Sequence, residues 1–409
     1  MKRILYVADI YPFPYDTGGK LRTANILMQL SKYFDIDFVC FSIDSINDER
    51  IKISEKYCKS VKVFYSPKPN TFKKMLNLFT PTCNAAFIVK SKEMNEYIYK
   101  LVKRHEYMAI FVERLYAYQY VKQVKEKLFP DVPVYVDMHD IEREAMGYFG
   151  KITKNVFRRL HYQVETQKVI SLEQKTVQAA DYMIAVSERD KDLYSEYFPD
   201  TKKKWFSVNN GVDLSKAINE PVVERDSNLV IFMGSLRHPP NLHGLRWFVQ
   251  TAWPQIIEER PTTKFVIVGS GEITEEDNNL FEKAKGVEFK GYVENLYPLL
   301  RKASCLAVPL FSGSGTRLKI LEAFSFELPV VSTSVGAEGI PCTDGEEILL
   351  ADDETHMKDS ILKILDDRNF SRYLADQAYK LVSNDYNWEI IVKKLAKKMD
   401  GQFAEVEKR

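Results

Sequence analysis

The sequence predicts an α/β protein built from two doubly wound domains, each a parallel sheet with helices on both faces. Short β-rich runs alternate with helical patterns along most of the chain, which is typical of parallel sheets covered by helices. At 409 residues the chain is long enough for two domains that each bury a core. A polar stretch at 210–228, which begins with Asn-Gly-Val-Asp, separates two series of such elements and indicates a hinge.

The first domain is expected over residues 1–210. Its predicted strands are apolar runs of four to six residues, at 3–8, 36–41, 61–65, 109–112, 134–137, 182–186 and 205–208. Longer helical patterns separate them, notably at 20–33, 93–104 and 151–179.

The second domain is expected over residues 211–387. Its predicted strands lie at 229–233, 264–268, 287–289, 305–308 and 329–332, with helices near 242–259, 275–285 and 295–302. A last helical pattern, in residues 388–409, follows the completed second sheet. We expect it to be free to pack back on the first domain.

The composition restricts the classes of function that the protein can have. Fifty-eight basic and fifty-seven acidic residues nearly cancel, so no overall charge favours nucleic acid. The five cysteines are widely spread, with no pair at metal-ligand spacing, and indicate reduced thiols and a cytoplasmic protein. The apolar run after the basic start ends at Asp9, which is too short for a signal peptide. No run approaches the roughly eighteen apolar residues that a membrane span needs.

The segment 313–324 (GSGTRLKILEAF) is the most informative part of the chain. A glycine-rich turn follows a predicted strand and opens a helix, whose first N–H groups favour phosphate. Arg317 and Lys319 add positive charge there. Glu322 lies roughly 9 Å further along the helix, a suitable distance for a carboxylate to accept the ribose hydroxyls of a nucleotide diphosphate. The alternative is an ordinary turn with a solvated Glu322. The candidate donor ligands of the turn are Gly313, Ser314, Gly315 and Thr316.

Motifs along nearly the whole chain resemble the GT-B superfamily of nucleotide-sugar glycosyltransferases, and specifically its family four, the retaining group 1 enzymes. The resemblance lies in their order and spacing, at 11–22, 137–142, 180–188, 209–213, 232–235, 265–271, 289–292, 313–324, 336–339 and 386–389. It implies a GT-B fold, with two facing Rossmann-like domains and an interdomain cleft. It also implies that the first domain binds the acceptor and the second binds the nucleotide sugar.

In the first domain the resemblance assigns roles to residues at the ends of two predicted strands. Gly18 and Gly19 would bring backbone N–H groups near the donor phosphate, where the alternative is a plain turn that uses positive φ. His139 would contact the transferred sugar near the reaction centre, where the alternative is a structural histidine. The further candidates, for acceptor contact, are Arg22, Glu142 and Arg143. A solvated side chain is the alternative for Arg22.

In the second domain the sequence departs from the family pattern. Beside Gly234, a candidate donor ligand, Ser235 stands where an arginine is usual, and Asn241 stands near the position of a lysine. We therefore expect Arg317, with Lys319 second, to stabilise the charge of the leaving nucleotide diphosphate. The absence of an acidic metal-binding cluster in the sequence pattern indicates a reaction without metal or other cofactor.

Two more departures concern the opening of the helix and its end. Ser314 replaces the first of two glutamates that the family carries eight positions apart, and Glu322 is the second. This leaves the identity of the sugar open. Glu327 replaces a helix-ending glycine and should cost about 1 kcal/mol if its backbone is left-handed.

These observations predict a retaining hexosyltransferase that moves a sugar from a nucleotide diphosphate donor to a hydroxyl of a sugar or lipid-linked glycan, in polysaccharide or glycoconjugate biosynthesis. The leaving diphosphate itself would take the acceptor proton, so no protein nucleophile is required. One alternative is a nucleotide-sugar epimerase on the same scaffold, which would act without an acceptor. Another is a catalytically silent binding or scaffold protein, which the departures at Ser235, Asn241 and Ser314 favour.

Two stretches, 71–79 and 151–162, mix basic and apolar residues, the second with Lys151, Lys154, Arg158 and Arg159. Basic amphipathic helices of this kind lie on anionic membrane surfaces. One reading is therefore a peripheral protein at the inner face of the cell membrane. The other is an ordinary amphipathic helix with solvated lysines.

Overall fold

The computed structural model describes residues 1–15, 17–67, 69, 71–128, 130–153, 155–312 and 317–406. The chain divides into two compact units, each described here by itself. Unit 1 comprises Met1–Asn209 and Ile391–Arg409, and unit 2 comprises Asn210–Ile390. No helix in the described ranges combines the length and the apolar character needed to cross a membrane.

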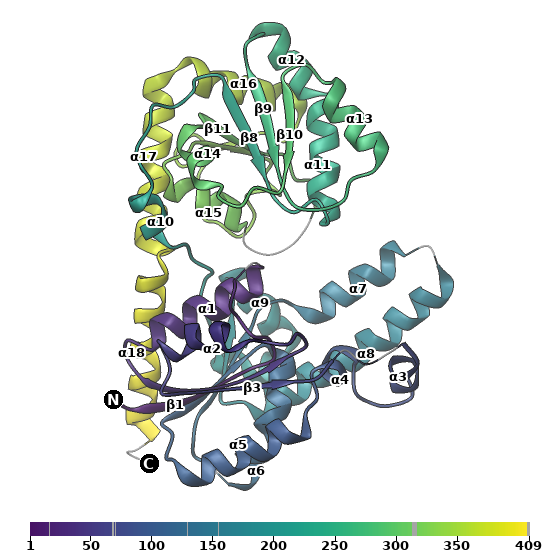
Figure 1. The fold of residues 1–409 in the computed structure, drawn as a ribbon, viewed down its shortest axis with the longest axis vertical. Coiled ribbons are helices and arrows are strands. Elements are labelled where there is room, and N and C mark those ends of the chain that lie inside the picture. Colours follow the sequence, from purple (N-terminus) through teal and green to yellow (C-terminus); the bar gives the residue numbers. More distant parts are fainter. Residues whose placement is uncertain are drawn as a thin grey trace. The chain divides into compact units, whose positions relative to one another are not determined.

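Figure 1 shows the sheet of unit 1. It contains seven strands in the order β3-β2-β1-β4-β5-β6-β7, and every neighbouring pair of its strands is parallel. Its central strands are buried on both faces, as in β4, where Ile110, Phe111 and Val112 are all fully buried. The strands are β1 (Arg3–Ala8), β2 (Asp35–Ser42), β3 (Ser60–Tyr65), β4 (Ala109–Glu113), β5 (Val134–Met138), β6 (Tyr182–Ala185) and β7 (Trp205–Ser207).

The helices of unit 1 lie between successive strands, as parallel pairing requires. They are α1 (Gly18–Leu30), α2 (Asp48–Glu55), α3 (Thr71–Asn77), α4 (Asn84–Ile88), α5 (Lys92–Arg104), α6 (Lys122–Lys127), α7 (Glu142–Ile152), α8 (Val156–Ala179) and α9 (Glu188–Tyr197), with 3₁₀ helices η1 (Leu115–Tyr120) and η2 (Pro199–Lys204).

The last helix, α18 (Trp388–Val406), contributes most of its length to unit 1. There Asp400 forms an ion pair with Lys2 at 2.6 Å, and Gln402 accepts a hydrogen bond from the Tyr135 hydroxyl at 2.8 Å. The end of the chain therefore packs beside its start.

Unit 2 contains a six-stranded parallel sheet in the order β10-β9-β8-β11-β12-β13. Its strands are β8 (Leu229–Met233), β9 (Lys264–Val268), β10 (Val287–Gly291), β11 (Cys305–Val308), β12 (Val330–Ser332) and β13 (Leu349–Leu350). Its helices are α10 (Leu214–Asn219), α11 (Pro239–Gln250), α12 (Ala252–Glu259), α13 (Glu275–Lys283), α14 (Tyr297–Lys302), α15 (Leu318–Ser325), α16 (Glu354–Asp366) and α17 (Arg368–Asp385).

All twelve predicted strands are present, within one or two residues at their ends, and the short β13 was not predicted. The predicted helix at 151–179 is wrong in its start, because α8 begins only after Asn155, whose side chain accepts from the N–H of Arg158 and caps the helix. The predicted helix at 242–259 is wrong as a single helix, since it is interrupted at Thr251, where α11 ends and α12 begins.

Glu327, just past the end of α15, has a left-handed backbone with φ of 55°. The strained conformation anticipated from the sequence is therefore present. Arg225 holds this corner, because its guanidinium donates to the carbonyl oxygens of Phe326 at 2.7 Å and Glu327 at 2.9 Å. It also donates to the Ala303 carbonyl after α14 at 2.5 Å, and so satisfies the carbonyl ends of two helices.

Replacing Glu327 with glycine should stabilise unit 2. The substitution keeps the backbone carbonyl that Arg225 binds and removes the steric cost of a left-handed residue, about 1 kcal/mol. We expect the midpoint of its thermal unfolding, followed by calorimetry, to rise by about 2–4 °C. Glu327→Ala is the matched control, because it removes the carboxylate and keeps the strain. An equal rise in both variants would contradict the backbone explanation.

Candidate functional site

The carboxyl ends of three neighbouring strands in unit 1 carry charged residues. β1 is followed by Asp9, β4 ends with Glu113, and β5 leads through Asp137 to His139. In the strand order β1 lies between β2 and β4, where the winding of the sheet reverses. Such a switch point is the usual ligand-binding place of a doubly wound sheet.

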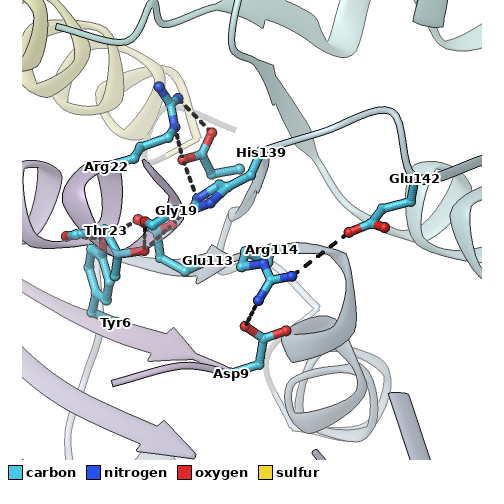
Figure 2. Close-up of polar contacts among 10 residues, drawn as sticks. Tyr6, Asp9, Gly19, Arg22, Thr23, Glu113, Arg114, His139 and Glu142 are labelled. Atoms are coloured by element: carbon cyan, nitrogen blue, oxygen red, sulfur yellow. Dashed lines mark hydrogen bonds and ion pairs between the residues drawn. The ribbon is translucent and has the colours of Figure 1, made fainter. Parts of the chain in front are cut away.

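His139 lies between two buried carboxylates (Figure 2). Its Nε2 is 2.5 Å from Oε2 of Glu113 and 3.4 Å from Oδ2 of Asp137. Glu113 also accepts hydrogen bonds from the hydroxyls of Tyr6 and Thr23. Both carboxylates are fully buried, and their charge is compensated by neighbouring donors.

This environment favours the imidazolium form of His139. Burial alone would lower the pKa of the ring, but the adjacent Glu113 and Asp137 outweigh it and raise the pKa to about 9. Among the described residues, Nδ1 of His139 is buried without a hydrogen-bond partner. A protonated ring therefore has one N–H group to offer to a ligand.

Arg22 is buried beneath this cluster, with an exposed fraction of 2%. Its Nε and Nη2 each donate to Asp137, both at 2.7 Å. Burial would raise the pKa of Asp137, but Arg22 and His139 hold it below its usual range. The solvated arginine considered from the sequence is thus wrong. The geometry gives Arg22 a positioning role, with no exposed cation for direct acceptor contact.

Gly18 and Gly19 form the first turn of α1 rather than a turn before it, and neither has a positive φ. The first N–H groups of a helix lack intrahelical acceptors, so small residues here leave these donors accessible. A Cβ atom on Gly19 would lie 3.5 Å from Nδ1 of His139. The glycine therefore lies beside the free nitrogen of the histidine.

Glu113, Asp137 and His139 offer one ligand atom each within 4.8 Å of one another, which is a spacing that a metal ion could use. A metal would require a neutral histidine and a free carboxylate oxygen. Here the His139 pKa of about 9 favours the protonated ring, and Arg22 occupies Asp137. The three residues are therefore better arranged to hold a protonated histidine than to ligate a metal ion.

Beside this cluster lies a second charged group, which the sequence analysis missed except for Glu142. Arg114 is 3.3 Å from Asp9 and 3.9 Å from Glu142, and its backbone has a positive φ of 72°. Burial raises the pKa of Glu142 to about 7, and Asp140 adds to the shift while Arg114 opposes it. Strained non-glycine residues cluster at functional sites.

Arg143 does not join these groups. Its Nε lies 2.5 Å from Glu173 of α8, and its guanidinium lies over the rings of Tyr197 and Phe198, at 4.3 and 4.7 Å from the ring centroids. The side chain ties α7 to α8 and α9, so its expected acceptor contact has no support in this geometry.

Unit 2 has a buried cationic site at the carboxyl edge of its own sheet. Lys319, on the first turn of α15, donates from Nζ to Oδ1 of Asn241 at 2.9 Å and lies over the Phe232 ring at 4.4 Å. The Asn241 amide in turn donates to the Ser235 carbonyl at 2.7 Å. The residues that depart from the family pattern, Ser235 and Asn241, thus hold the lysine of α15 in place.

The ammonium of Lys319 is only partly charged near neutral pH. Burial, with repulsion from Arg317 second, lowers its pKa to about 7. Burial, Arg317 and Lys319 also lower the pKa of His238, at the start of α11. A Cβ atom on Gly234 would lie 2.6 Å from Nζ, so glycine is required for the lysine to reach this position.

Glu322 lies just over one turn into α15 and is half-buried. Burial raises the pKa of its carboxyl group, and Lys216 opposes the shift. The candidate residues Gly313, Ser314, Gly315 and Thr316 lie outside the described residues. The described part of the site therefore consists of Arg317, Lys319, Glu322, Gly234 and Asn241.

Comparison with known proteins places this site within a recognised domain. The family model described as Glycosyl transferases group 1 matches residues 227–367. An uncharacterized 44.6 kDa protein in the cps region of Klebsiella pneumoniae is 25% identical over 410 residues, which cover 95% of this chain and 97% of that protein.

Solved structures share the whole fold. Sucrose-phosphate synthase from Thermosynechococcus elongatus has a TM-score of 0.69 at 16% identity, covering 99% of this chain and 100% of that one. HepE from Anabaena, in complex with UDP and glucose, has a TM-score of 0.64 at 14% identity, covering 98% and 100%. The predicted GT-B fold, with two Rossmann-like domains, is confirmed.

The charged His139 should make stability depend on pH. Its folded pKa of about 9 lies above the unfolded value of 6.5, so the stabilisation is complete below pH 6.5 and is lost as pH rises through 9. We expect His139→Gln to lower the unfolding free energy on the order of 2–3 kcal/mol more at pH 6 than at pH 10. Urea unfolding at both pH values measures this difference. A loss of stability that is equal at both would contradict the charged histidine.

Proposed function

We propose that this chain is a group 1 glycosyltransferase that transfers a sugar from a nucleotide diphosphate sugar to a hydroxyl acceptor with retention of configuration. The HepE structure contains UDP and glucose, and a second HepE structure contains UDP-glucose, so proteins of this fold hold such donors. The proposal for this chain rests on its own residues, and first on the cationic site of unit 2.

The observation that carries the proposal is the pair Arg317 and Lys319 at the start of α15. Arg317 is buried and Lys319 is partly buried, and they lie within reach of each other's charge, because Arg317 adds to the effect of burial in lowering the pKa of Lys319. Cationic side chains and the first N–H groups of a helix both favour an anion, so their combination at the start of α15 suits a phosphate group. A diphosphate at the helix N-terminus would supply that anion.

Glu322 extends this assignment to the nucleoside. It lies on the same helix, about 6 Å along the axis from its start. We assign its carboxylate to the two ribose hydroxyls, with Arg317 and Lys319 on the diphosphate. The family pattern places a lysine near the position of Asn241. In this chain Lys319 of α15 supplies the positive charge at that place instead.

In the proposed reaction, these positive charges are sufficient to stabilise the leaving group. The bond from the anomeric carbon to the phosphate oxygen breaks, and the acceptor oxygen bonds to that carbon on the same face. The acceptor proton passes to the departing diphosphate. Arg317 and the protonated Lys319 stabilise the negative charge that develops on this group.

We assign the sugar and acceptor to the switch point of unit 1. His139 offers Nδ1–H to a sugar hydroxyl, while Glu113 and Asp137 keep the ring charged and Arg22 orients Asp137. Arg114 and Glu142 are assigned to the acceptor. A role in polysaccharide assembly rests on the relative in the cps region and on the resemblance of the motifs, and a cytoplasmic location on the cysteine pattern.

Nucleotide binding tests the assignment directly. We expect a thermal-shift screen of nucleoside diphosphates and their sugars, without metal, to identify one nucleotide that stabilises the protein. Glu322→Ala should weaken its affinity by about tenfold or more, because charge-assisted hydrogen bonds to ribose are lost. Glu346→Ala, which removes an exposed carboxylate of unit 2, is the control. Unchanged affinity in Glu322→Ala would refute the site.

The lowered pKa of Lys319 predicts that the nucleotide binds together with a proton. A diphosphate should raise the pKa of about 7, so at pH 8 binding should take up close to one proton, or roughly 0.9. Calorimetry in buffers of different ionisation enthalpy counts these protons. Lys319→Met, which keeps the length of the side chain without its charge, should remove the uptake and weaken binding. The same proton count in both proteins would exclude Lys319 from the phosphate site.

The two alternative functions have their own outcomes. An epimerase would convert the sugar of its donor in the absence of any acceptor. A silent scaffold would bind the nucleotide sugar but would not cleave it at any acceptor concentration. Product analysis by NMR separates these outcomes, and the anomeric configuration of a transferred sugar tests retention.

A further inference from the structure

The end of the α7–α8 hairpin exposes apolar side chains that nothing else in the described structure covers. Figure 1 shows the two helices side by side, projecting from the rest of unit 1. At the start of α8, residues 156–160 are all exposed, over more than a full helical turn. Three of them are large and apolar, namely Val156 (72% exposed), Phe157 (84%) and Leu160 (59%). Such clusters on a surface mark interaction sites.

The described residues of this hairpin end, defined as residues 145–164, are held by local contacts. The Asn155 side chain caps α8 through the N–H of Arg158, and Arg159 donates to the Thr153 carbonyl at 3.3 Å. A Cβ atom on Gly150 would lie 3.3 Å from Cβ of Tyr162, so the two helices pack closely. The exposed apolar residues therefore lie at the start of a helix that is capped and that packs closely against its neighbour.

The charges of the hairpin are strongly divided along its length. The hairpin end contains no aspartate or glutamate but carries Lys151, Lys154, Arg158 and Arg159. The acidic residues lie toward the other end of the two helices, where Glu165 and Glu173 are buried and paired with Lys168 and Arg143. A binding partner of this surface must therefore be both anionic and apolar.

A second exposed apolar pair lies on the segment tied to the same helix. Leu76 is 53% exposed and Phe79 is 91% exposed. Lys168 of α8 donates to the Asn77 carbonyl between them at 3.0 Å. Residues 67–92 also contain lysines and no acidic residue. Like the hairpin end, this segment therefore combines exposed apolar residues with basic ones.

We propose that the hairpin end docks on an anionic lipid surface, with Phe157, Val156 and Leu160 entering the interface and the guanidinium groups of Arg158 and Arg159 contacting lipid phosphates. The apolar residues surround a projecting helix end instead of lining a groove, which suits insertion into a fluid interface more than binding of a folded partner. The flanking cations match the negative surface potential of such a membrane. This inference is independent of the proposed transfer reaction.

Cosedimentation of the full-length protein with vesicles tests this surface. The vesicles contain phosphatidylcholine with or without phosphatidylglycerol. We expect binding only to the anionic vesicles and weaker binding at higher salt. Phe157→Asp and Arg158→Glu should each reduce the partition coefficient by about tenfold or more.

Matched controls separate the surface from general charge and hydrophobicity. Lys203→Glu makes the same charge change at an exposed residue of η2, and Val222→Asp replaces an apolar residue of unit 2 that is 84% exposed. Both should bind vesicles as the unmodified protein does. All four variants should keep the thermal unfolding midpoint of the unmodified protein without any ligand, which shows that they fold and makes the test independent of the transfer reaction.

Three outcomes would overturn the inference. One is the absence of binding to anionic vesicles at low salt. Another is equal loss of binding in the hairpin variants and their controls. The third is concentration-dependent self-association, measured by sedimentation velocity, that Phe157→Asp abolishes while vesicle binding persists, since the surface would then join two copies of this chain.

Discussion

Every strand in each of the two sheets runs parallel to its neighbours, and this constraint decides where chemistry can occur. Parallel pairing brings all carboxyl ends of a sheet to one edge, and the strand orders place β1 beside β4 and β8 beside β11 where the winding reverses. Residues far apart in the chain meet there. Arg22 and Asp137 are separated by 115 positions, and Asn241 and Lys319 by 78. The candidate sites of both units depend on this convergence.

The two units handle buried charge in opposite ways. In unit 1 the cations Arg22 and His139 are matched by Asp137 and Glu113, so the cluster is complete by itself and is suited to hold one N–H in a fixed direction. In unit 2 the cations Arg317 and Lys319 repel each other, and burial, with this repulsion second, lowers the pKa of Lys319. The first arrangement suits a neutral ligand, and the second suits an anionic one.

Much of the fold could be predicted because it follows from local patterns. Apolar runs identified twelve strands. The possibility of a left-handed Glu327 came from its replacement of a glycine in the family pattern, and its φ of 55° bears this out. The site was predicted less completely. Glu113 was missed because it lies one residue beyond the expected strand end, and its role depends on Tyr6, Thr23 and His139, all distant in sequence. Likewise, no local spacing relates Asn241 to Lys319, so the departure at Asn241 could not be matched to the lysine that contacts it.

The lowered pKa of Lys319 also has a consequence for selectivity. A site that sheds one proton when empty carries close to one positive charge at alkaline pH, and two only when a ligand supplies enough negative charge to retain the proton. Under the proposed function, a diphosphate would restore this second charge more fully than a small singly charged anion would. Such a site would therefore favour multiply charged phosphate ligands before any contact with base or sugar.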